Sequence, residues 1–214
     1  MRLMGGIKLI EQSVFDSWAE EYDLDVVESD LKNEYPFAGY QKLMRLLYEK
    51  IIEKAPVQIL DVGIGTGTLA SKLYESGIAV TGIDFSDEML QIAENKMPNA
   101  KLIKWDLSKG MPPEIGGKKF DIIISTYALH HFTDPEKLRL IPLILTHLEK
   151  DGVFIIGDIG FETLADLEVC KDKFADIWDY DEFFFVMSEL RQGLSCHIRH
   201  ELLSHCCVLI ELRL

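Results

Sequence analysis

The chain has 214 residues, of which 48% are hydrophobic and 27% charged, an ordinary composition for a single globular domain. Its 36 acidic and 22 basic residues give a formal net charge of −14, and the basic residues form no cluster longer than a pair, which disfavours a nucleic-acid partner. No apolar run approaches the roughly 20 residues that a membrane span needs, so we expect no membrane partner.

The first residues, MRLMGGIKLIEQ, contain neither the apolar stretch nor the cleavage site of a signal peptide, so we expect a cytoplasmic protein. Four cysteines without CxxC spacing fit reduced thiols, and the adjacent Cys206 and Cys207 would point to opposite faces of a strand. The histidines form no HExxH motif and no cluster with cysteine, so we expect no metal site.

The first 50 residues have a helical pattern with many aromatic side chains. We predict that residues 1–50 form a helical lid over a single compact domain at 51–214. The aromatic residues expected on the lid are Phe15, Trp18, Tyr22, Tyr35, Phe37 and Tyr40.

Strand-like and helix-like segments alternate through the centre of the chain. Apolar, β-branched runs predict strands at 57–63, 78–84, 100–106, 119–129 and 153–159. Helical spacing of apolar residues predicts helices at 66–76, 86–97 and 134–150. Ser86 is the expected cap of the second helix, and Asp134 followed by Pro135 that of the third. Pro142 should bend the third helix, and Lys150-Asp151-Gly152 should end it.

The end of the chain differs from this alternation. Two helical segments are predicted at 161–174 and 178–191, and residues 193–214 read as two strands of an antiparallel hairpin. Strands buried on both faces and separated by helices indicate an α/β fold, with a mostly parallel sheet and helices on both faces.

The segment LDVGIGTGTL at 60–69 places glycines where the first strand should leave the sheet, which suggests that a ligand approaches the backbone there. A dinucleotide site would have the pattern GxGxxG, but Thr68 stands at the third glycine position. In addition, Asp61 would bring negative charge toward a pyrophosphate. Both observations argue against a dinucleotide.

S-adenosylmethionine fits these residues better, because it has no phosphate and carries an ammonium and a sulfonium. Asp61 suits the ammonium, and the glycine turn lets the ligand approach the backbone. Asp84, at the end of the second strand, can accept both ribose hydroxyls. Asp106, at the end of the third strand, can accept from the adenine amino group, and the Leu107 backbone can read the ring edge. Ligands of open α/β sheets bind at these strand ends.

Phe85 and Met89 follow Asp84 directly, and their apolar side chains can pack against the faces of the adenine. We therefore include both residues in the predicted cofactor site.

The ordered motifs DVGIGTG at 61–67, GID at 82–84, WDL at 105–107 and FDIIISTYALHHF at 120–132 resemble those of class I S-adenosylmethionine-dependent methyltransferases, in particular the small-molecule branch. The resemblance covers residues 12 to 212. It implies a Rossmann-like sheet of seven strands in the order 3-2-1-4-5-7-6, with an antiparallel last strand. It also implies an enzyme that uses S-adenosylmethionine as its cofactor.

The resemblance also extends to the N-terminal segment and adds one residue to the predicted cofactor site. Within FDSWAEEYD at 15–23, Tyr22 stands where the family has a tyrosine that reaches the methionine carboxylate, although packing of an amphipathic helix on the sheet explains the same pattern. The predicted set is Tyr22, Asp61, Gly63, Gly65, Gly67, Asp84, Phe85, Met89, Asp106, Leu107 and Thr126.

No catalytic residue is identified by the sequence, because transfer from a sulfonium needs a general base only when the acceptor arrives protonated. The candidates for such a base are Tyr127, His130 and His131, in the loop after the fourth strand. His131 is the candidate carried forward, and a histidine that bonds to the backbone at a strand end is the alternative. Asp158 and the aromatic run from Asp179 to Phe185 are candidates for lining an acceptor pocket, and for Phe183 to Phe185 the alternative is that they pack a helix.

The segment STYA at 125–128 lacks the motifs of DNA methyltransferases, so we expect a small-molecule acceptor of unknown identity and a monomer or homodimer. Two alternatives stay open. One is a protein that binds S-adenosylmethionine or S-adenosylhomocysteine without catalysis, and the other is a nicotinamide oxidoreductase.

Overall fold

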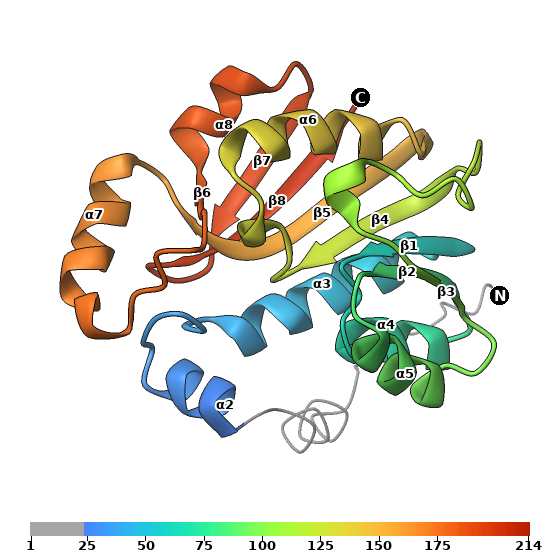
Figure 1. The fold of residues 1–214 in the computed structure, drawn as a ribbon, viewed down its shortest axis with the longest axis horizontal. Helices are drawn as coiled ribbons and strands as arrows, with labels where there is room; N and C mark the ends of the chain where they lie inside the picture. Colours follow the sequence, from blue (N-terminus) through green and yellow to red (C-terminus); the bar gives the residue numbers. More distant parts are fainter. Residues whose placement is uncertain (1–23) are drawn as a thin grey trace, which may run out of the picture.

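The computed structural model describes residues 24–214, which form one twisted sheet with helices on both sides (Figure 1). The strands are β1 Gln58–Val62, β2 Ala79–Asp84, β3 Lys101–Lys104, β4 Phe120–Thr126, β5 Leu148–Phe161, β6 Phe185–Val186, β7 His197–Leu202 and β8 Cys207–Arg213. The α-helices are α2 Leu24–Leu31, α3 Tyr40–Lys54, α4 Thr68–Glu75, α5 Asp87–Lys96, α6 Asp134–Leu145, α7 Leu164–Lys173 and α8 Met187–Gly193. Short 3₁₀ helices are η1 Leu107–Lys109, η2 Leu129–His131 and η3 Ala175–Ile177.

The sheet has the order β3-β2-β1-β4-β5-β8-β7. Neighbouring strands from β3 to β5 are parallel, whereas β8 runs antiparallel to both β5 and β7. The predicted order 3-2-1-4-5-7-6 is therefore confirmed, with β7 and β8 as the predicted sixth and seventh strands. The two-residue strand β6 is additional and pairs with the end of β5.

Helices cover both faces of this sheet, with α3, α4 and α5 on one side and α6 and α8 on the other (Figure 1). Successive side chains of a strand point to opposite faces. Accordingly, Ile122 and Ile124 of β4 pack in the core under α3 and α4, and Ile123 packs in the core under α6. All three are at most 1% exposed, which explains why the strand reads as a continuous apolar run.

Two predicted helices were too long. The helix predicted at 134–150 ends at Leu145, because Leu148 already pairs with Phe120 and the following residues continue into β5. Its cap is Thr133, whose capping box with Glu136 replaces the predicted cap Asp134.

The second of these helices, predicted at 178–191, begins only at Met187 as α8. Phe185 instead pairs with Gly160 of β5, so this part of the chain adds the short strand β6 to the sheet. The predicted hairpin at the end of the chain is confirmed as β7 and β8.

The N-terminal prediction is only partly covered by the described residues, because Phe15, Trp18 and Tyr22 lie outside them. Helix α3 continues through position 50 and buries Leu43, Met44 and Leu47 against the sheet. The division into a lid at 1–50 and a domain at 51–214 stays a prediction.

The four cysteines are free, as predicted, and all lie in the described part of the chain. Cys206 and Cys207 pack in different cores, on opposite faces of the hairpin. None of the helices in residues 24–214 is long and apolar enough to cross a bilayer.

Candidate functional site

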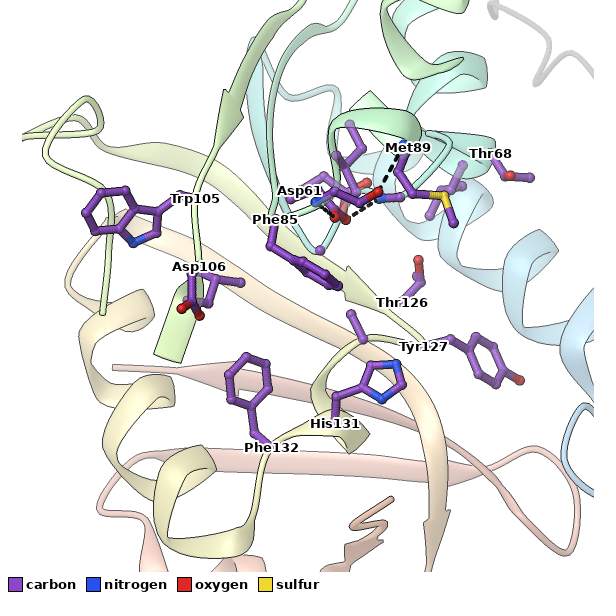
Figure 2. Close-up of a pocket in the computed structure, with 18 of the residues that line it drawn as sticks. Asp61, Thr68, Phe85, Met89, Trp105, Asp106, Thr126, Tyr127, His131 and Phe132 are labelled. Atoms are coloured by element: carbon purple, nitrogen blue, oxygen red, sulfur yellow. Dashed lines mark hydrogen bonds between the residues drawn. The ribbon is translucent and has the colours of Figure 1, made fainter. Parts of the chain in front are cut away.

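A cavity of about 560 Å³ opens at the carboxyl ends of β1, β2 and β4 (Figure 2). Ligands of open α/β sheets bind at this edge of the sheet. The walls of the cavity come from the glycine turn, from the segments that follow β2, β3 and β4, and from α3. The residues are Tyr40, Met44, Asp61, Gly63, Ile64, Gly65, Thr68, Leu69, Asp84, Phe85, Ser86, Met89, Trp105, Asp106, Leu107, Thr126, Tyr127, Ala128, His131 and Phe132.

The glycine turn between β1 and α4 presents bare backbone to this cavity. Gly65 has φ +52, and a Cβ built on it would meet no atom within 4 Å. Gly63 is needed for a different reason, since its Cβ would lie 2.4 Å from that of Ala128. Gly67 does not line the cavity. The space of its missing side chain is filled by Met97 of the segment after α5.

Asp61, at the end of β1, lies at the floor of the cavity and is only 2% exposed. Within residues 24–214, its Oδ1 is a buried side-chain oxygen without a hydrogen-bond partner. Burial, together with the charge of the nearby Asp84, raises the pKa of Asp61 to about 8. This oxygen can therefore accept a hydrogen bond from a cationic or neutral donor in the cavity.

Asp84, at the end of β2, holds the glycine turn in place. Its Oδ2 accepts a hydrogen bond from Gly65 N at 2.8 Å, and its Oδ1 accepts one from Ser86 N at 3.0 Å. A carboxylate oxygen can accept a second hydrogen bond. Asp84 can therefore bind a ligand in the cavity while it keeps both backbone bonds.

Asp106 and Leu107 lie on the wall that follows β3. Asp106 caps η1, because its Oδ1 accepts from Ser108 N at 2.9 Å, and this bonding lowers its pKa. The neighbouring Trp105 also lines the cavity, and its indole nitrogen donates to Gly110 O at 2.8 Å. Figure 2 shows Asp106 and Trp105 on the same side of the cavity.

Apolar side chains border the cavity where it meets solvent. Phe85 is 72% exposed and Met89 is 42% exposed, although both are large and hydrophobic. Phe132 approaches from the segment after β4 (Figure 2). Such exposed apolar side chains at a cavity are typical of a binding site.

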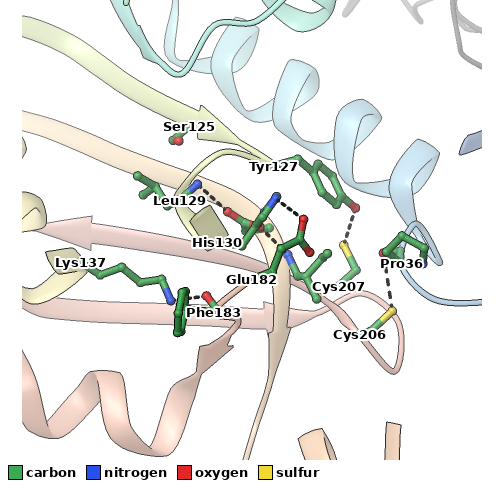
Figure 3. Close-up of polar contacts among 12 residues, drawn as sticks. Pro36, Ser125, Tyr127, Leu129, His130, Lys137, Glu182, Phe183, Cys206 and Cys207 are labelled. Carbon is green, nitrogen blue, oxygen red and sulfur yellow. Dashed lines mark hydrogen bonds and ion pairs between the residues drawn. The ribbon is translucent and has the colours of Figure 1, made fainter. Parts of the chain in front are cut away.

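The segment after β4 brings Thr126, Tyr127 and His131 to the cavity. Tyr127 has φ +47, its ring stacks on Tyr40 at 5.0 Å, and its hydroxyl donates to Cys207 Sγ at 3.6 Å (Figure 3). Burial raises the pKa of Tyr127 well above its ordinary value, so the phenol stays protonated. This residue shapes the wall and is no acid–base group at neutral pH.

The pKa values of the two adjacent histidines in η2 are shifted in opposite directions. His130 is buried between Asp158, 2.6 Å from its Nδ1, and Glu182, 3.4 Å from its Nε2 (Figure 3). Burial lowers the pKa of His130, but the two carboxylates outweigh it and raise the value to about 10. His131 lines the cavity, and burial and the charge of His130 lower its pKa. At neutral pH, His131 is the neutral imidazole of the pair.

The other predicted acceptor-pocket residues do not line the cavity. Asp158 is fully buried beneath His130. Phe184 and Phe185 are buried in the packing around β5 and β6, and the Phe183 carbonyl accepts from Lys137 Nζ. The packing alternative therefore describes this aromatic run better, although it lies in a loop and a strand and not in a helix.

Residues 59–152 match the family model of a methyltransferase domain. An uncharacterized methyltransferase of Oceanobacillus iheyensis is 33% identical over 154 residues, which cover 70% of this chain and 67% of that protein. Another from Bacillus cytotoxicus is 37% identical over 149 residues, covering 69% of this chain and 66% of that protein. The chain belongs to the methyltransferase family. It spans about two thirds of the length of these relatives.

Solved structures of methyltransferases share the fold. Magnesium protoporphyrin IX methyltransferase from Synechocystis PCC 6803, with bound S-adenosylhomocysteine, has a TM-score of 0.65 and 18% identity, and the match covers 95% of both chains. A plantazolicin methyltransferase, in complex with a triazolic desmethylPZN analog and S-adenosylhomocysteine, has a TM-score of 0.61 and 17% identity, with 93% of both chains covered. Because the sequence identities are only 17% and 18%, these two matches show a shared fold and nothing beyond it.

These comparisons confirm the predicted family, its class I fold, the enzyme class and S-adenosylmethionine as the cofactor of this methyltransferase family. The roles of individual residues stay predictions. Of the predicted cofactor set, Tyr22 lies outside the described residues and Gly67 lies behind the cavity wall, whereas the others line it.

The sequence did not predict several wall residues, among them Trp105, Phe132 and Met44. Trp105 directly precedes Asp106, so its position in the WDL motif was an available signal. Met44 had no such signal, because it is one of several apolar residues along α3 and the sequence does not show which of them reaches the cavity.

Proposed function

We propose that this methyltransferase transfers a methyl group from S-adenosylmethionine to a small-molecule acceptor, with the cofactor in the cavity at the carboxyl edge of the sheet. The observation that carries the proposal is Asp61 Oδ1, a buried oxygen at the cavity for which residues 24–214 supply no hydrogen-bond partner. A buried carboxylate requires a charged or hydrogen-bonding partner. The ammonium of the cofactor's methionine end supplies that partner.

The residues of the cavity fit the remainder of the cofactor. Asp84 offers free acceptor sites for the ribose hydroxyls, and Gly65 leaves room for a ligand against the backbone. In the described part of the chain, the residues that line the cavity include no lysine or arginine. A dinucleotide would place its pyrophosphate among the carboxylates of the cavity, and like charges repel. These carboxylates therefore support a nucleoside without phosphate as the ligand.

Asp106 and Leu107 are the proposed partners of the adenine edge, and Phe85 and Met89 are the proposed partners of its faces. The support is their position, since all four line the same cavity and the two apolar residues are exposed to solvent. Covering these side chains with an aromatic base removes apolar surface from water, which stabilises the complex.

The sulfonium of the bound cofactor supplies an activated methyl group. The contribution of the chain is to orient the acceptor in line with it and to exclude water. Thr126 and His131 line the side of the cavity away from Asp106 (Figure 2). His131 has the lowered pKa of a neutral imidazole, so it is the proposed base for an acceptor that arrives protonated.

A small acceptor is supported by the cavity volume and by the charge of the chain. A cavity of about 560 Å³ lies within the roughly 300–1,000 Å³ of small-molecule sites. The formal net charge of −14 disfavours a phosphate backbone as the acceptor.

Cofactor binding is tested with Gly65→Val and a matched control, Gly77→Val. Both glycines have positive φ, +52 and +86, and neither Cβ would meet an atom within 4 Å, so the backbone strain is comparable. Only Gly65 lines the cavity. In calorimetric titration with S-adenosylhomocysteine, we expect Gly65→Val to weaken binding at least about 100-fold, equivalent to about 2.7 kcal/mol, and Gly77→Val to bind like the wild type.

Titration of the wild type with NAD separates this proposal from an oxidoreductase. Preference for NAD, or equal binding of S-adenosylhomocysteine by both glycine variants, contradicts the assignment of the cavity. Incubation with a labelled methyl donor and a metabolite extract then tests catalysis, and tight binding without any transfer supports the non-catalytic alternative.

A further inference from the structure

Three potential metal ligands come together beside the cavity, outside the proposed cofactor-binding residues. They are His130 and His131 of η2 and Glu182 of the loop before β6. One ligand atom of each lies within 4.8 Å of the other two. The sequence did not predict this group, because Glu182 is more than 50 residues away from the histidines.

The first ligand is held by its neighbours. Asp158 Oδ1 accepts from His130 Nδ1 at 2.6 Å, which leaves Nε2 on the side of Glu182 (Figure 3). Asp158 is itself fixed, since it also accepts from Leu129 N at 3.1 Å and from Ile159 N at 2.8 Å. A carboxylate behind a histidine is the usual second-shell arrangement of metal sites, because it fixes the ring and makes the other nitrogen a better ligand.

The loop that carries Glu182 is attached to the same histidine. Phe183 N donates to His130 O at 2.7 Å, and Lys137 Nζ binds the Phe183 carbonyl (Figure 3). The side chain of Glu182 is 18% exposed, and the partner that the described residues provide for it is His130 Nε2. Glu182 is therefore held near both histidines, and no lysine or arginine among residues 24–214 is bound to its carboxylate.

We propose that His130, His131 and Glu182 bind a divalent transition-metal ion such as Zn²⁺. Two imidazoles and one carboxylate are a common zinc ligand set, and the remaining coordination position is open in catalytic sites. Ligand atoms of a tetrahedral zinc site are about 3.3 Å apart, so the group has to contract. Rotation of the half-exposed His131 and of Glu182 provides this movement, whereas His130 stays fixed by Asp158. The ion replaces the proton on Nε2 of His130, and this proton is released to solvent.

The position of the ion relative to the cavity gives it a function, and this step rests on the proposed methyl transfer. His131 lines the cavity, so an ion bound to it lies at the wall where the acceptor is proposed to bind. A divalent ion there favours an acceptor with a hydroxyl or thiol group, because coordination lowers the pKa of that group. His131 would then serve as a ligand and no longer as a base.

The site is tested by calorimetric titration of the metal-free full chain with Zn²⁺. We expect one equivalent to bind, and we expect His131→Gln and Glu182→Gln each to weaken binding at least about tenfold. Glu182→Gln keeps a hydrogen-bond acceptor for His130, and His131 is exposed, so both variants should remain folded, which circular dichroism checks. The matched control is His200→Gln, since His200 forms a separate pair with Glu162 at 2.6 Å and should not affect the affinity.

The same preparations are titrated with S-adenosylhomocysteine, so that the two proposals are judged separately. Loss of zinc binding in the variants with unchanged S-adenosylhomocysteine binding supports the metal site. Absence of zinc binding to the wild type, or equal affinity in the wild type and both ligand variants, overturns the metal site whether or not S-adenosylhomocysteine binds. All six histidines lie in the described residues, so binding that survives both ligand substitutions would point to other side chains, such as the buried thiols.

Discussion

Asp61 combines two properties that are rarely found in one carboxyl group without a functional reason. It is buried at 2% exposure, and one of its oxygens has no hydrogen-bond partner within the described residues. Such a group disfavours its own ionised form. It therefore provides a direct way to test whether the cavity is built for a cation.

We expect the pH dependence of stability to change in Asp61→Asn. The pKa of Asp61 rises from 3.8 to about 8 in the folded protein, so between these values the folded state keeps a proton that the unfolded chain releases. Asp61 therefore makes the wild type less stable as the pH rises, by up to about 1.4 kcal/mol per pH unit. Urea unfolding at about pH 5 and pH 7 should show the variant gaining stability relative to the wild type. A difference that does not vary with pH would contradict the raised pKa.

Binding of the cofactor's ammonium should lower the pKa of Asp61 again, because a nearby cation favours the ionised carboxylate. Below pH 8 the wild type should therefore release up to one proton when S-adenosylhomocysteine binds. Calorimetry in buffers with different ionisation enthalpies measures this release. Asp61→Asn should bind more weakly and release none through this group, whereas equal proton release by both proteins would show that another group is responsible.

The three acidic residues were predictable because each follows an apolar run that reads as a strand, and parallel strands end at one edge of a sheet. Their individual states were not predictable. The sequence does not show that Asp61 is buried without a partner, that Asp84 binds the glycine turn, or that Asp106 caps η1. The states of Asp61 and Asp84 depend on contacts with segments that are distant in the chain, whereas the cap made by Asp106 is a contact with Ser108, two residues away.

Among the elements, α3 and β5 are in unusually close contact. Gly157 of β5 lies against Leu43 of α3, and a Cβ at Gly157 would be 2.7 Å and 2.8 Å from the two δ carbons of Leu43. Because α3 also supplies Tyr40 and Met44 to the cavity, the depth at which it packs on the sheet influences the shape of the site.

Gly157→Ala should lower the free energy of unfolding by about 1–3 kcal/mol, because the added methyl group overpacks this contact. Leu43→Ala alone should cost about 2–5 kcal/mol. In the double variant the small side chain makes room for the new methyl group, so the loss should be at least about 0.5 kcal/mol smaller than the sum.

Denaturant unfolding of the four proteins measures this coupling. Gly117→Ala is the control, since its Cβ would meet no atom within 4 Å, and the change there should not exceed about 1 kcal/mol. If the losses of unfolding free energy in Gly157→Ala and Leu43→Ala simply add in the double variant, α3 accommodates the extra methyl group without strain.

The predicted elements failed where pairing with a distant strand decides the structure. The predicted helix at 134–150 includes Leu148, yet Leu148 pairs with Phe120, and the helix ends earlier. Phe185 likewise joins β5 through its pairing with Gly160. By contrast, Ser86 caps α5 as predicted, because its side chain accepts from Met89 N only three residues away.

At the scale of the whole molecule, the fold was predictable because the order of the motifs and the buried strands both indicate a parallel sheet. The arrangement of the proposed acceptor side was not predictable, since it depends on α3, η2 and the loop around Glu182, which are far apart in the sequence. Spacing along the chain does not report such contacts.

Cofactor binding should stabilise the whole chain against heat. A ligand at 100 times its dissociation constant stabilises the folded state by about 2.7 kcal/mol. For a chain of this size, each kcal/mol raises Tm by about 2–4 °C, so S-adenosylhomocysteine should raise it by about 5–10 °C. Differential scanning fluorimetry of the wild type and Gly65→Val measures this shift. A shift of equal size in the variant would contradict a ligand bound at the glycine turn.

The cavity is assembled from three separate stretches of polypeptide. One contributes residues from Asp61 to Leu107, and the other two are α3 and the residues from Thr126 to Phe132. In the proposed assignment, the first stretch holds the methyl donor and the other two face the acceptor. Mutations in α3 or after β4 would then exchange one acceptor for another, while descendants of one ancestral enzyme keep the use of their common donor.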